Sequence, residues 1–380
     1  MQAASSPLVH VLAFDAGALR VDLFRYPLRF EHAPVTARGA DELGDETMFV
    51  RVRDGSGAEG WGEGCPDTYY GEIPGTVAGA LPHLARAAAP ALERAVAAAG
   101  GLEGLVGRAA DGLAPVSDAM DVALGGNGTA KAALESALHD LLARRAGRSL
   151  RDWLGAPRTL PPTDATLWIA SPAEMAERAA AYAHHPAMKL KVGVGGEEEV
   201  LRRVRGAYGG PLRLDANCGW DLRRALELLP AMESAGVELI EQPFPAHRLG
   251  DMAALAAATE IPVIADEDCV VLADIERVAG HVDGVNLKVV KVGGIGPLLR
   301  GLRRAEELGL RRMFGCMTET LLGTAAAAAV AGPAEFLDLD GPLGSIGDPW
   351  EGLELGADCR WQLDDRRPGS GVALRLPPPA

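Results

Sequence analysis

Short apolar segments alternate with helical patterns from about residue 166 to residue 340. Each segment ends in a polar or charged residue, and the eight segments read TLWIA, AMKLKV, PLRLDAN, VELIEQP, IPVIADED, DGVNLKVVK, RRMFGCM and EFLDLDG. The intervals between them are 23, 24, 26, 25, 22, 28 and 22 residues, counted between Trp168, Lys191, Asp215, Glu241, Asp266, Lys288, Cys316 and Asp338. A strand-plus-helix unit of nearly constant length predicts eight parallel strands in an α/β barrel. A doubly wound open sheet is the alternative, but no G-x-G-x-x-G follows the first segment.

The pattern before residue 140 is different. Runs rich in Val, Phe and Trp, such as LRVDLFRYPLRF and TMFVRVRDGSGAEGWGE, predict strands with a hairpin turn at D-G-S-G. An Ala- and Leu-rich helical stretch follows them. After the eighth segment the chain is rich in Gly, Pro and Asp. We therefore expect an α+β unit at residues 1–140, a barrel at 141–340, and a C-terminal segment at 341–380 that returns to the N-terminal unit.

Composition narrows the class of protein. With 37 Lys plus Arg against 52 Asp plus Glu, the net charge of −15 argues against nucleic acids and anionic membranes as partners. A hydrophobic fraction of 48%, without an apolar run near the ~20 residues that span a bilayer, predicts a globular protein. The N-terminus lacks the basic segment of a secretory signal. Five cysteines, none in a CxxC, favour reduced thiols in the cytoplasm, and neither disulfides nor a structural zinc are expected. A small molecule is the expected partner, and a homo-oligomer is compatible with the sequence.

Lysine is rare in this chain and concentrated in two places. Only five of the 37 basic residues are lysine. Four of the five form the pairs Lys189 with Lys191 and Lys288 with Lys291, and each pair lies at the end of an apolar segment. Arginine keeps its proton at neutral pH, whereas a lysine can be tuned to act as a base. The two pairs therefore indicate proton chemistry.

Carboxylates end several of the same segments. Asp215, Glu241 and Asp266 end the third, fourth and fifth, and Asp338 and Asp340 end the eighth. The carboxyl ends of barrel strands meet at one mouth, where active sites are built. A lone aspartate at a strand end most often caps a helix, but capping does not predict carboxylates on three successive strands with lysines on both sides. Three carboxylates without His or Cys predict a site for a hard cation, which we take to be Mg²⁺.

At these residues the sequence resembles the enolase superfamily, in its muconate-lactonizing branch. The matching motifs are A-K-A-A-L-E-S-A-L-H-D-L, K-L-K, D-A-N, E-Q-P, A-D-E, N-L-K-V-V-K-V-G-G and D-L-D-G-P. The resemblance implies an α+β capping domain over a (β/α)₇β modified TIM barrel. It also implies Mg²⁺ on Asp215, Glu241 and Asp266, and acid/base lysines at Lys191 and Lys288.

Within this superfamily the chain looks like the dipeptide epimerases of the L-Ala-D/L-Glu type. The D-x-D of Asp338 and Asp340 implies a pair that holds the α-ammonium of the substrate. The G-C-M-T-E-T run before it implies that Met317 and Glu319 also contribute to substrate binding. Two departures are visible: Asp268 replaces the usual Ser of A-D-E-S, and G-P-L-G-S-I-G-D replaces an apolar run after D-L-D-G-P.

The predicted metal site and the two lysine pairs together indicate an isomerase. Removing a proton α to a carboxylate requires a metal to stabilise the developing charge, and a base that is neutral near pH 7. Like-charge repulsion from Lys189 is expected to lower the pKa of Lys191, and Lys291 is expected to act similarly on Lys288. Lysines on two opposite faces would remove a proton and return one. We expect epimerisation at the α-carbon of the C-terminal residue of a dipeptide.

Two other classes stay open at this point. N-acylamino-acid racemisation, o-succinylbenzoate synthesis and muconate cycloisomerisation use similar sites, but they leave Asp338 and Asp340 without a cationic partner. A non-catalytic binding barrel does not explain the lysine pairs.

Substrate side chains are expected to meet the capping segment 26–47 and the loop after Gly64. Arg29 and Arg38 suit an acidic side chain, and Arg29 is the predicted substrate-binding residue. Four neighbouring carboxylates suit a basic side chain instead: Asp41, Glu42, Asp45 and Glu46.

Overall fold

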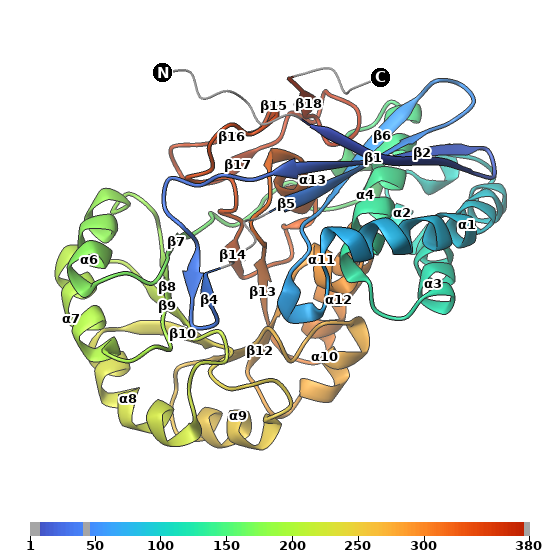
Figure 1. The fold of residues 1–380 in the computed structure, drawn as a ribbon. Coiled ribbons are helices and arrows are strands. Elements are labelled where there is room, and N and C mark those ends of the chain that lie inside the picture. The colour runs from blue at the N-terminus through green and yellow to red at the C-terminus, as the bar shows by residue number, and fades with distance from the viewer. Residues whose placement is uncertain (1–7, 41–45, 376–380) are drawn as a thin grey trace.

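The structure is a computed structural model, and it describes residues 8–40 and 46–375. Eight parallel strands form one sheet in which they follow each other in chain order, and a bridge between Thr163 and Leu337 brings its two edges together (Figure 1). The predicted barrel is therefore confirmed. Its strands are β7 (Ala165–Leu167), β8 (Met188–Lys191), β9 (Leu212–Asp215), β10 (Val237–Glu241), β11 (Val263–Ala265), β12 (Gly284–Leu287), β13 (Arg311–Gly315) and β14 (Phe336–Asp338).

Helices follow the first seven barrel strands and surround them (Figure 1). Several begin at strong capping residues. Ser171 caps the first of them, with Pro172 at its first position and Glu174 completing a capping box. The helices are α6 (Pro172–Ala181), α7 (Glu197–Ala207), α8 (Leu222–Ser234), α9 (Leu249–Ala256), α10 (Leu272–Val278), α11 (Val289–Val292), α12 (Ile295–Glu307) and α13 (Leu321–Val330). Within the described residues no helix follows β14, as expected for a (β/α)₇β barrel.

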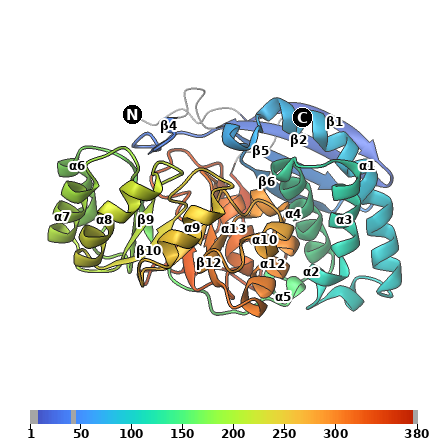
Figure 2. The same ribbon diagram turned by 90° about the horizontal axis from the view of Figure 1, so that it is seen from below.

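The N-terminal unit is an antiparallel sheet in the order β1-β2-β5-β6, with helices packed on one face (Figure 2). Its strands are β1 (Val9–Ala16), β2 (Leu19–Pro27), β5 (Glu46–Arg53) and β6 (Glu59–Gly64). Its helices are η1 (Thr68–Tyr70), α1 (Pro74–Ala98), η2 (Glu103–Leu105), α2 (Ala109–Gly112), α3 (Ala114–Ala123), α4 (Gly128–Arg145) and α5 (Leu150–Leu154). No helix in the described part of the chain, the 25-residue α1 included, combines the length and the apolar character that crossing a membrane requires.

Alternate glycines on β6 bring helix α4 against the sheet. A Cβ on Gly60 would lie 2.3 Å from the carbonyl oxygen of Ala137, and one on Gly62 would lie 2.1 Å from that of Ala133. Real Cβ atoms do not approach so closely, so these positions require glycine. The helix has the small residues Ala133 and Ala137 at these contacts, so the backbones of α4 and β6 pack directly together.

A short hairpin between β2 and β5 extends from the N-terminal unit to the barrel mouth. It consists of β3 (Val35–Thr36) and β4 (Gly39–Ala40), and we call it the capping hairpin. The backbone N–H of Ile169, just after β7, donates a 3.0 Å hydrogen bond to the carbonyl of Val35. The hairpin therefore lies over the carboxyl end of the first barrel strand.

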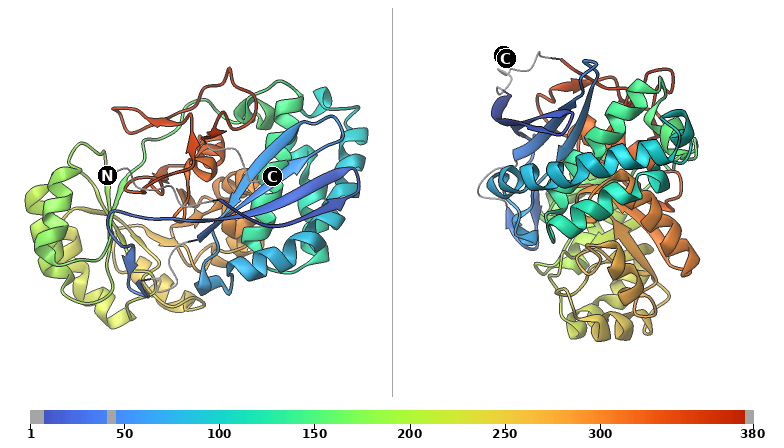
Figure 3. Two further views of the ribbon diagram at one scale, coloured as in Figure 1. Left: turned by 45° about the horizontal axis from the view of Figure 1, so that its top comes forward. Right: turned by 90° about the vertical axis from the view of Figure 1, so that its right-hand side faces the viewer.

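The segment after β14 runs back over the N-terminal sheet (Figure 3). The ring of Trp350 packs edge-on against Phe49 and Trp61, with centroid distances of 5.5 and 5.2 Å. The predicted domain limits at residues 140 and 340 stay predictions: helix α4 crosses the first limit to end at Arg145. The segment contains two paired ribbons, of β15 (Trp350–Glu351) with β18 (Ala373–Leu374) and of β16 (Glu354–Leu355) with β17 (Trp361–Gln362).

Candidate active site

Three buried carboxylates meet at the barrel mouth. Asp215 ends β9, Glu241 ends β10, and Asp266 directly follows β11, and each is 0% exposed. One oxygen from each lies within 4.8 Å of the others. Burial raises the pKa of Glu241 to about 8, and the charge of Asp215 adds to this rise. Mutual repulsion in a buried site favours a bound cation, and three carboxylate oxygens fit a hard divalent ion such as Mg²⁺.

Lysines surround the carboxylates. Lys189 Nζ lies 3.1 Å from Asp215 Oδ2 and 2.8 Å from Glu241 Oε2. Burial alone would lower the pKa of Lys189, but Asp338, Glu241 and Asp215 raise it well above its ordinary value. Lys189 is therefore a fixed cation of the site.

Lys191 and Lys288 approach the carboxylate cluster from opposite sides. Lys191, at the end of β8, donates a 2.6 Å hydrogen bond to Asp215 Oδ2. Lys288, directly after β12, donates one of 2.8 Å to Asp266 Oδ2. In the sheet order, the strands that carry the three carboxylates are the ones between β8 and β12. The lysine strands are thus four positions apart in a ring of eight, which is the arrangement that two-sided proton transfer needs.

The predicted effect of Lys291 on Lys288 stays a prediction. Burial would lower the pKa of Lys288, but the Asp266 carboxylate outweighs it and raises that pKa above its ordinary value. Lys291 lies in helix α11 and donates hydrogen bonds of 2.7 Å to the Asp266 carbonyl and 2.9 Å to the Asn286 carbonyl. Lys291 therefore holds Asp266 in place, and its ammonium group forms an ion pair with the Asp266 carboxylate.

Asp338 and Asp340 differ in their partners. Asp338 Oδ2 accepts a 2.7 Å hydrogen bond from Lys189, so its charge is neutralised. Asp340 Oδ2 accepts one of 2.6 Å from the backbone N–H of Thr166, and among the described residues it has no ion-paired cation. Burial, followed by the charge of Asp338, raises the pKa of Asp340 to about 7. Asp340 is thus the member of the pair that lacks a positive partner.

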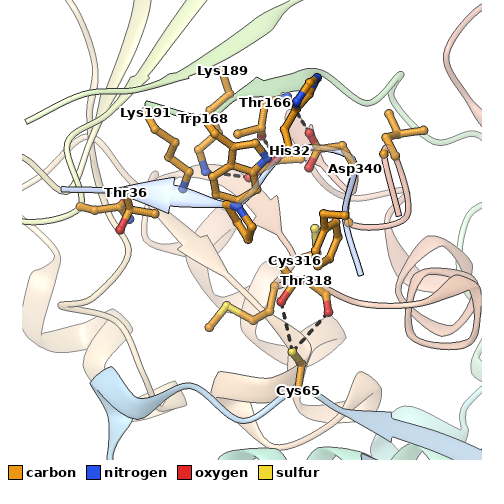
Figure 4. Close-up of a pocket in the computed structure, with 18 of the residues that line it drawn as sticks. His32, Thr36, Cys65, Thr166, Trp168, Lys189, Lys191, Cys316, Thr318 and Asp340 are labelled. Atoms are coloured by element: carbon orange, nitrogen blue, oxygen red, sulfur yellow. Dashed lines mark hydrogen bonds and ion pairs between the residues drawn. The ribbon is translucent and has the colours of Figure 1, made fainter. Parts of the chain in front are cut away.

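A cavity of about 430 Å³ lies between the barrel and the N-terminal unit, and it is lined by Lys189, Lys191 and Lys288 together with Asp338 and Asp340. In Figure 4 the side chains of Lys189, Lys191 and Trp168 enter it from β8 and the end of β7, while Thr36 belongs to the capping hairpin that crosses it. The lining residues with charged side chains are Glu31, His32, Arg38, Asp67, Arg178, Lys189, Lys191, Lys288, Asp338 and Asp340. Cavities of this size hold small ligands of a few hundred daltons.

Two of the predicted substrate-binding residues do not line this cavity. Arg29 lies outside it, and its carbonyl accepts a 2.7 Å hydrogen bond from the N–H of Ile346. Glu319 is buried behind it, where burial and then Glu63 raise its pKa to about 8. Met317 does line the cavity, with its sulfur 3.9 Å from Lys288 Nζ. The three carboxylates Asp41, Glu42 and Asp45 lie outside the described residues.

Arg38 is held by the protein itself. Its guanidinium forms an ion pair with the buried Glu267, lies 3.6 Å from Asp67 Oδ2, and sits 4.5 Å from the centre of the Tyr69 ring. Arg38 therefore fastens the capping hairpin to the loop after β11, and it also lines the cavity. Sequence reasoning missed this role, although Glu267 stands in A-D-E next to a predicted metal ligand.

Asp268 has a structural explanation. Its two carboxylate oxygens accept hydrogen bonds of 2.8 Å from Gln242 Nε2 and 2.7 Å from the backbone N–H of His247. Both donors belong to the loop after β10. The aspartate therefore holds that loop against the end of β11, a role that does not involve the cavity.

Two family models match the chain. The model described as "Enolase C-terminal domain-like" covers residues 172–347, and that described as "Mandelate racemase / muconate lactonizing enzyme, N-terminal domain" covers residues 27–155. The matches coincide with the barrel and with most of the N-terminal unit.

Several proteins that are similar to this chain are named as epimerases. The hydrophobic dipeptide epimerase of Roseobacter litoralis is 32% identical over 363 residues, 92% of this chain and 96% of that protein. The L-Ala-D/L-amino acid epimerase of Flavobacterium johnsoniae is 35% identical over 212 residues, and the match covers 56% of this chain and 63% of that protein. The dipeptide epimerase of Methylococcus capsulatus, solved with Mg and the dipeptide L-Arg-D-Lys, is 30% identical with a TM-score of 0.78, covering 95% of this chain and 99% of the other. The resemblance found in the motifs is confirmed: this chain belongs to the mandelate racemase / muconate lactonizing enzyme group of the enolase superfamily.

Proposed function

We propose that this chain is a Mg²⁺-dependent dipeptide epimerase, an isomerase that inverts the α-carbon of the C-terminal residue of its substrate. The observation that supports this most is the order of groups around the mouth. Lys191 and Lys288 stand on opposite sides of three consecutive carboxylate strands, and Asp340 faces the same cavity without a cation. The names of the relatives support the same substrate class.

The proposed metal ligands are Asp215, Glu241 and Asp266. Mg²⁺ held there would neutralise the carboxylate charge that stabilises the lysine ammonium groups, and would stabilise negative charge developing on the substrate carboxylate. Lys189 adds a fixed positive charge beside Asp215 and Glu241.

The proton transfer uses the two lysines. In one direction, Lys191 as the free amine takes the α-proton; the C–H bond breaks and its electron pair enters the enediolate of the substrate. Lys288 as the ammonium then gives a proton to the opposite face, and a new C–H bond forms with inverted configuration. The reverse direction exchanges the two roles. General acid–base catalysis of this kind contributes roughly 10²- to 10⁴-fold in rate.

Asp340 is proposed to bind the α-ammonium of the dipeptide. Asp340→Asn should therefore remove about 2–4 kcal/mol of transition-state stabilisation for free dipeptides. This loss corresponds to a fall in kcat/KM of roughly 30- to 800-fold. N-acetylation of the dipeptide removes the ammonium and should cause a comparable loss with the wild type, but little further loss with the variant. Steady-state kinetics with the free and acetylated substrates measures both effects.

Glu31→Gln is the matched control for Asp340→Asn. Glu31 also lines the cavity but is exposed, so its loss should change kcat/KM by less than about fivefold. If the wild type prefers an N-succinyl amino acid to every free dipeptide tested, the proposal that the substrate is a dipeptide is wrong. The barrel fold and the proposed roles of its lysines do not depend on this result. The substrates of those sister reactions bring no ammonium to Asp340.

The raised pKa of Asp340 predicts a pH effect on substrate choice. Below pH 7 the carboxyl group is increasingly protonated, and the neutral form binds an ammonium poorly. The ratio of kcat/KM for a free over an N-acetylated dipeptide should therefore fall by up to about tenfold per pH unit below pH 7. Titration of the lysines cancels in this ratio. In Asp340→Asn the ratio should not depend on pH, and a wild-type ratio that stays flat between pH 5 and 8 would contradict the assignment.

For the location of the protein we propose the cytoplasm. Four cysteines of the described residues are free thiols, which supports a reducing compartment: Cys218, Cys269, Cys316 and Cys359.

A further inference from the structure

Two histidines and a cysteine meet outside the active site. His184 and His185 lie between α6 and β8, at the amino end of β8, and Cys359 lies in the connection between β16 and β17. One nitrogen of each imidazole and the sulfur of Cys359 all lie within 4.8 Å of one another. His185 and Cys359 are buried, whereas His184 is exposed. The cluster therefore has a closed side in the protein and an open side toward solvent.

His185 has a ring nitrogen without a hydrogen-bond partner. Its side chain is buried, and Nδ1 has no hydrogen-bond partner. A hydrogen bond with the backbone of Thr163 engages the ring, which leaves Nδ1 as the nitrogen with a free lone pair. Burial, and then the neighbouring His184, lower the pKa of His185. A buried neutral imidazole with a free lone pair is the form that binds a transition metal.

The backbone holds these residues in place. The carbonyl of Cys359 accepts a 2.8 Å hydrogen bond from the N–H of Thr163, and the carbonyl of His185 accepts one of 2.9 Å from Tyr208 Oη. Cys359 has a positive φ of 57°, an uncommon conformation for a residue with a side chain. The segments that bring the sulfur to the histidines are thus held by backbone hydrogen bonds, and the exposed His184 is the ligand with the most room to adjust.

We propose that His184, His185 and Cys359 form a second metal site, with Zn²⁺ or a similar borderline divalent cation as its ligand. Two imidazoles and a thiolate are the donors that Zn²⁺ prefers, and three protein ligands leave a fourth position open to water on the side of His184. Binding forms a sulfur–metal bond, and the thiol proton of Cys359 is released to solvent.

This site differs from the proposed Mg²⁺ site in chemistry and in place. It offers nitrogen and sulfur, whereas Asp215, Glu241 and Asp266 offer oxygen. His185 lies before β8 and Lys191 ends it, so the two sites are at opposite ends of that strand. A cation here would join the C-terminal segment to the amino end of the barrel, and the expected effect is a more stable fold with unchanged turnover.

The test is a titration of the Mg²⁺-saturated protein with ZnCl₂, followed by calorimetry, with the melting temperature as a second readout. The wild type should bind Zn²⁺ in excess Mg²⁺ and melt at a higher temperature. His184→Ala and Cys359→Ser should each weaken this binding by more than about 100-fold and remove the shift in melting temperature. His83→Ala, which removes an exposed histidine from α1, is the matched control and should bind like the wild type.

Co²⁺ identifies the sulfur ligand directly. The wild type and His83→Ala should show a thiolate-to-cobalt charge-transfer absorption in excess Mg²⁺, and His184→Ala should lose it. Because His184 is exposed, its replacement does not threaten folding, so this variant decides the question even if Cys359→Ser folds poorly. The proposal is overturned if the wild type binds no Zn²⁺ in excess Mg²⁺, or if His184→Ala binds it with unchanged affinity. Either result leaves the proposed epimerase activity untouched.

Discussion

Lys191→Ala and Lys288→Ala are each expected to reduce epimerisation by at least roughly 10³-fold, because every inversion needs a base on one face and an acid on the other. The two variants should differ in the exchange of the α-proton with deuterated water. Lys191→Ala should lose exchange from one substrate epimer and keep part of it from the other, and Lys288→Ala should show the opposite preference. Proton NMR of each pure epimer in deuterated water measures this directly.

The matched control for these variants is Lys131→Ala. Lys131 is also a buried lysine, but it forms an ion pair of 2.7 Å with Asp121 and does not line the cavity. It should leave the exchange from both epimers equal to that of the wild type. Near wild-type epimerisation by either active-site variant, or loss of exchange from the same epimer in both, would refute the two-base scheme.

Removal of the metal is expected to have an effect of similar size. Exhaustive dialysis against EDTA should abolish turnover, and Mg²⁺ should restore it, because the charge that develops on the substrate carboxylate loses several kcal/mol of stabilisation. Glu241→Gln keeps the shape of the side chain but removes one ligand charge, and it should lose roughly 10³-fold in rate or more at saturating Mg²⁺.

The melting temperature separates this result from unfolding. The chelated protein should still unfold cooperatively, since Lys189 pairs with Asp215 and Glu241, and Lys288 with Asp266. Full activity of a folded protein after dialysis, with residual metal excluded by elemental analysis, would show that these carboxylates do not hold a required ion.

The barrel and the residues at its mouth were predictable because both depend on local patterns. Each strand is a short apolar run, and the residue that ends it points to the mouth by the rule that governs all parallel barrels. Asp215, Glu241, Lys191 and Lys288 could therefore be located from the position of each segment alone. The common placement of the three carboxylates needed no knowledge of the loops.

Residues outside the barrel strands were not predictable in the same way. Arg29 belongs to the segment 26–47 that was expected to meet the substrate, but it does not line the cavity. Lys291 follows Lys288 by one helical turn, and that turn directs its ammonium to the Asp266 carboxylate and carbonyl. The positions of both side chains depend on the tertiary structure, which local sequence patterns do not predict.

The cluster of His184, His185 and Cys359 shows the limit most clearly. Spacing rules detect metal sites whose ligands are close in sequence, and on that basis no structural zinc was expected. Here 175 residues separate Cys359 from His184. Only the return of the C-terminal segment to the barrel brings the sulfur to the histidines.

The most direct test of the epimerase assignment is a library of free dipeptides incubated with the Mg²⁺-loaded protein in deuterated water. Mass spectrometry and chiral separation then report which members gain deuterium and at which residue. The account predicts that a subset of dipeptides gains one deuterium at the α-carbon of the C-terminal residue and forms the corresponding epimer. The absence of exchange from every free dipeptide, together with exchange from an N-acylated amino acid under the same conditions, would contradict it.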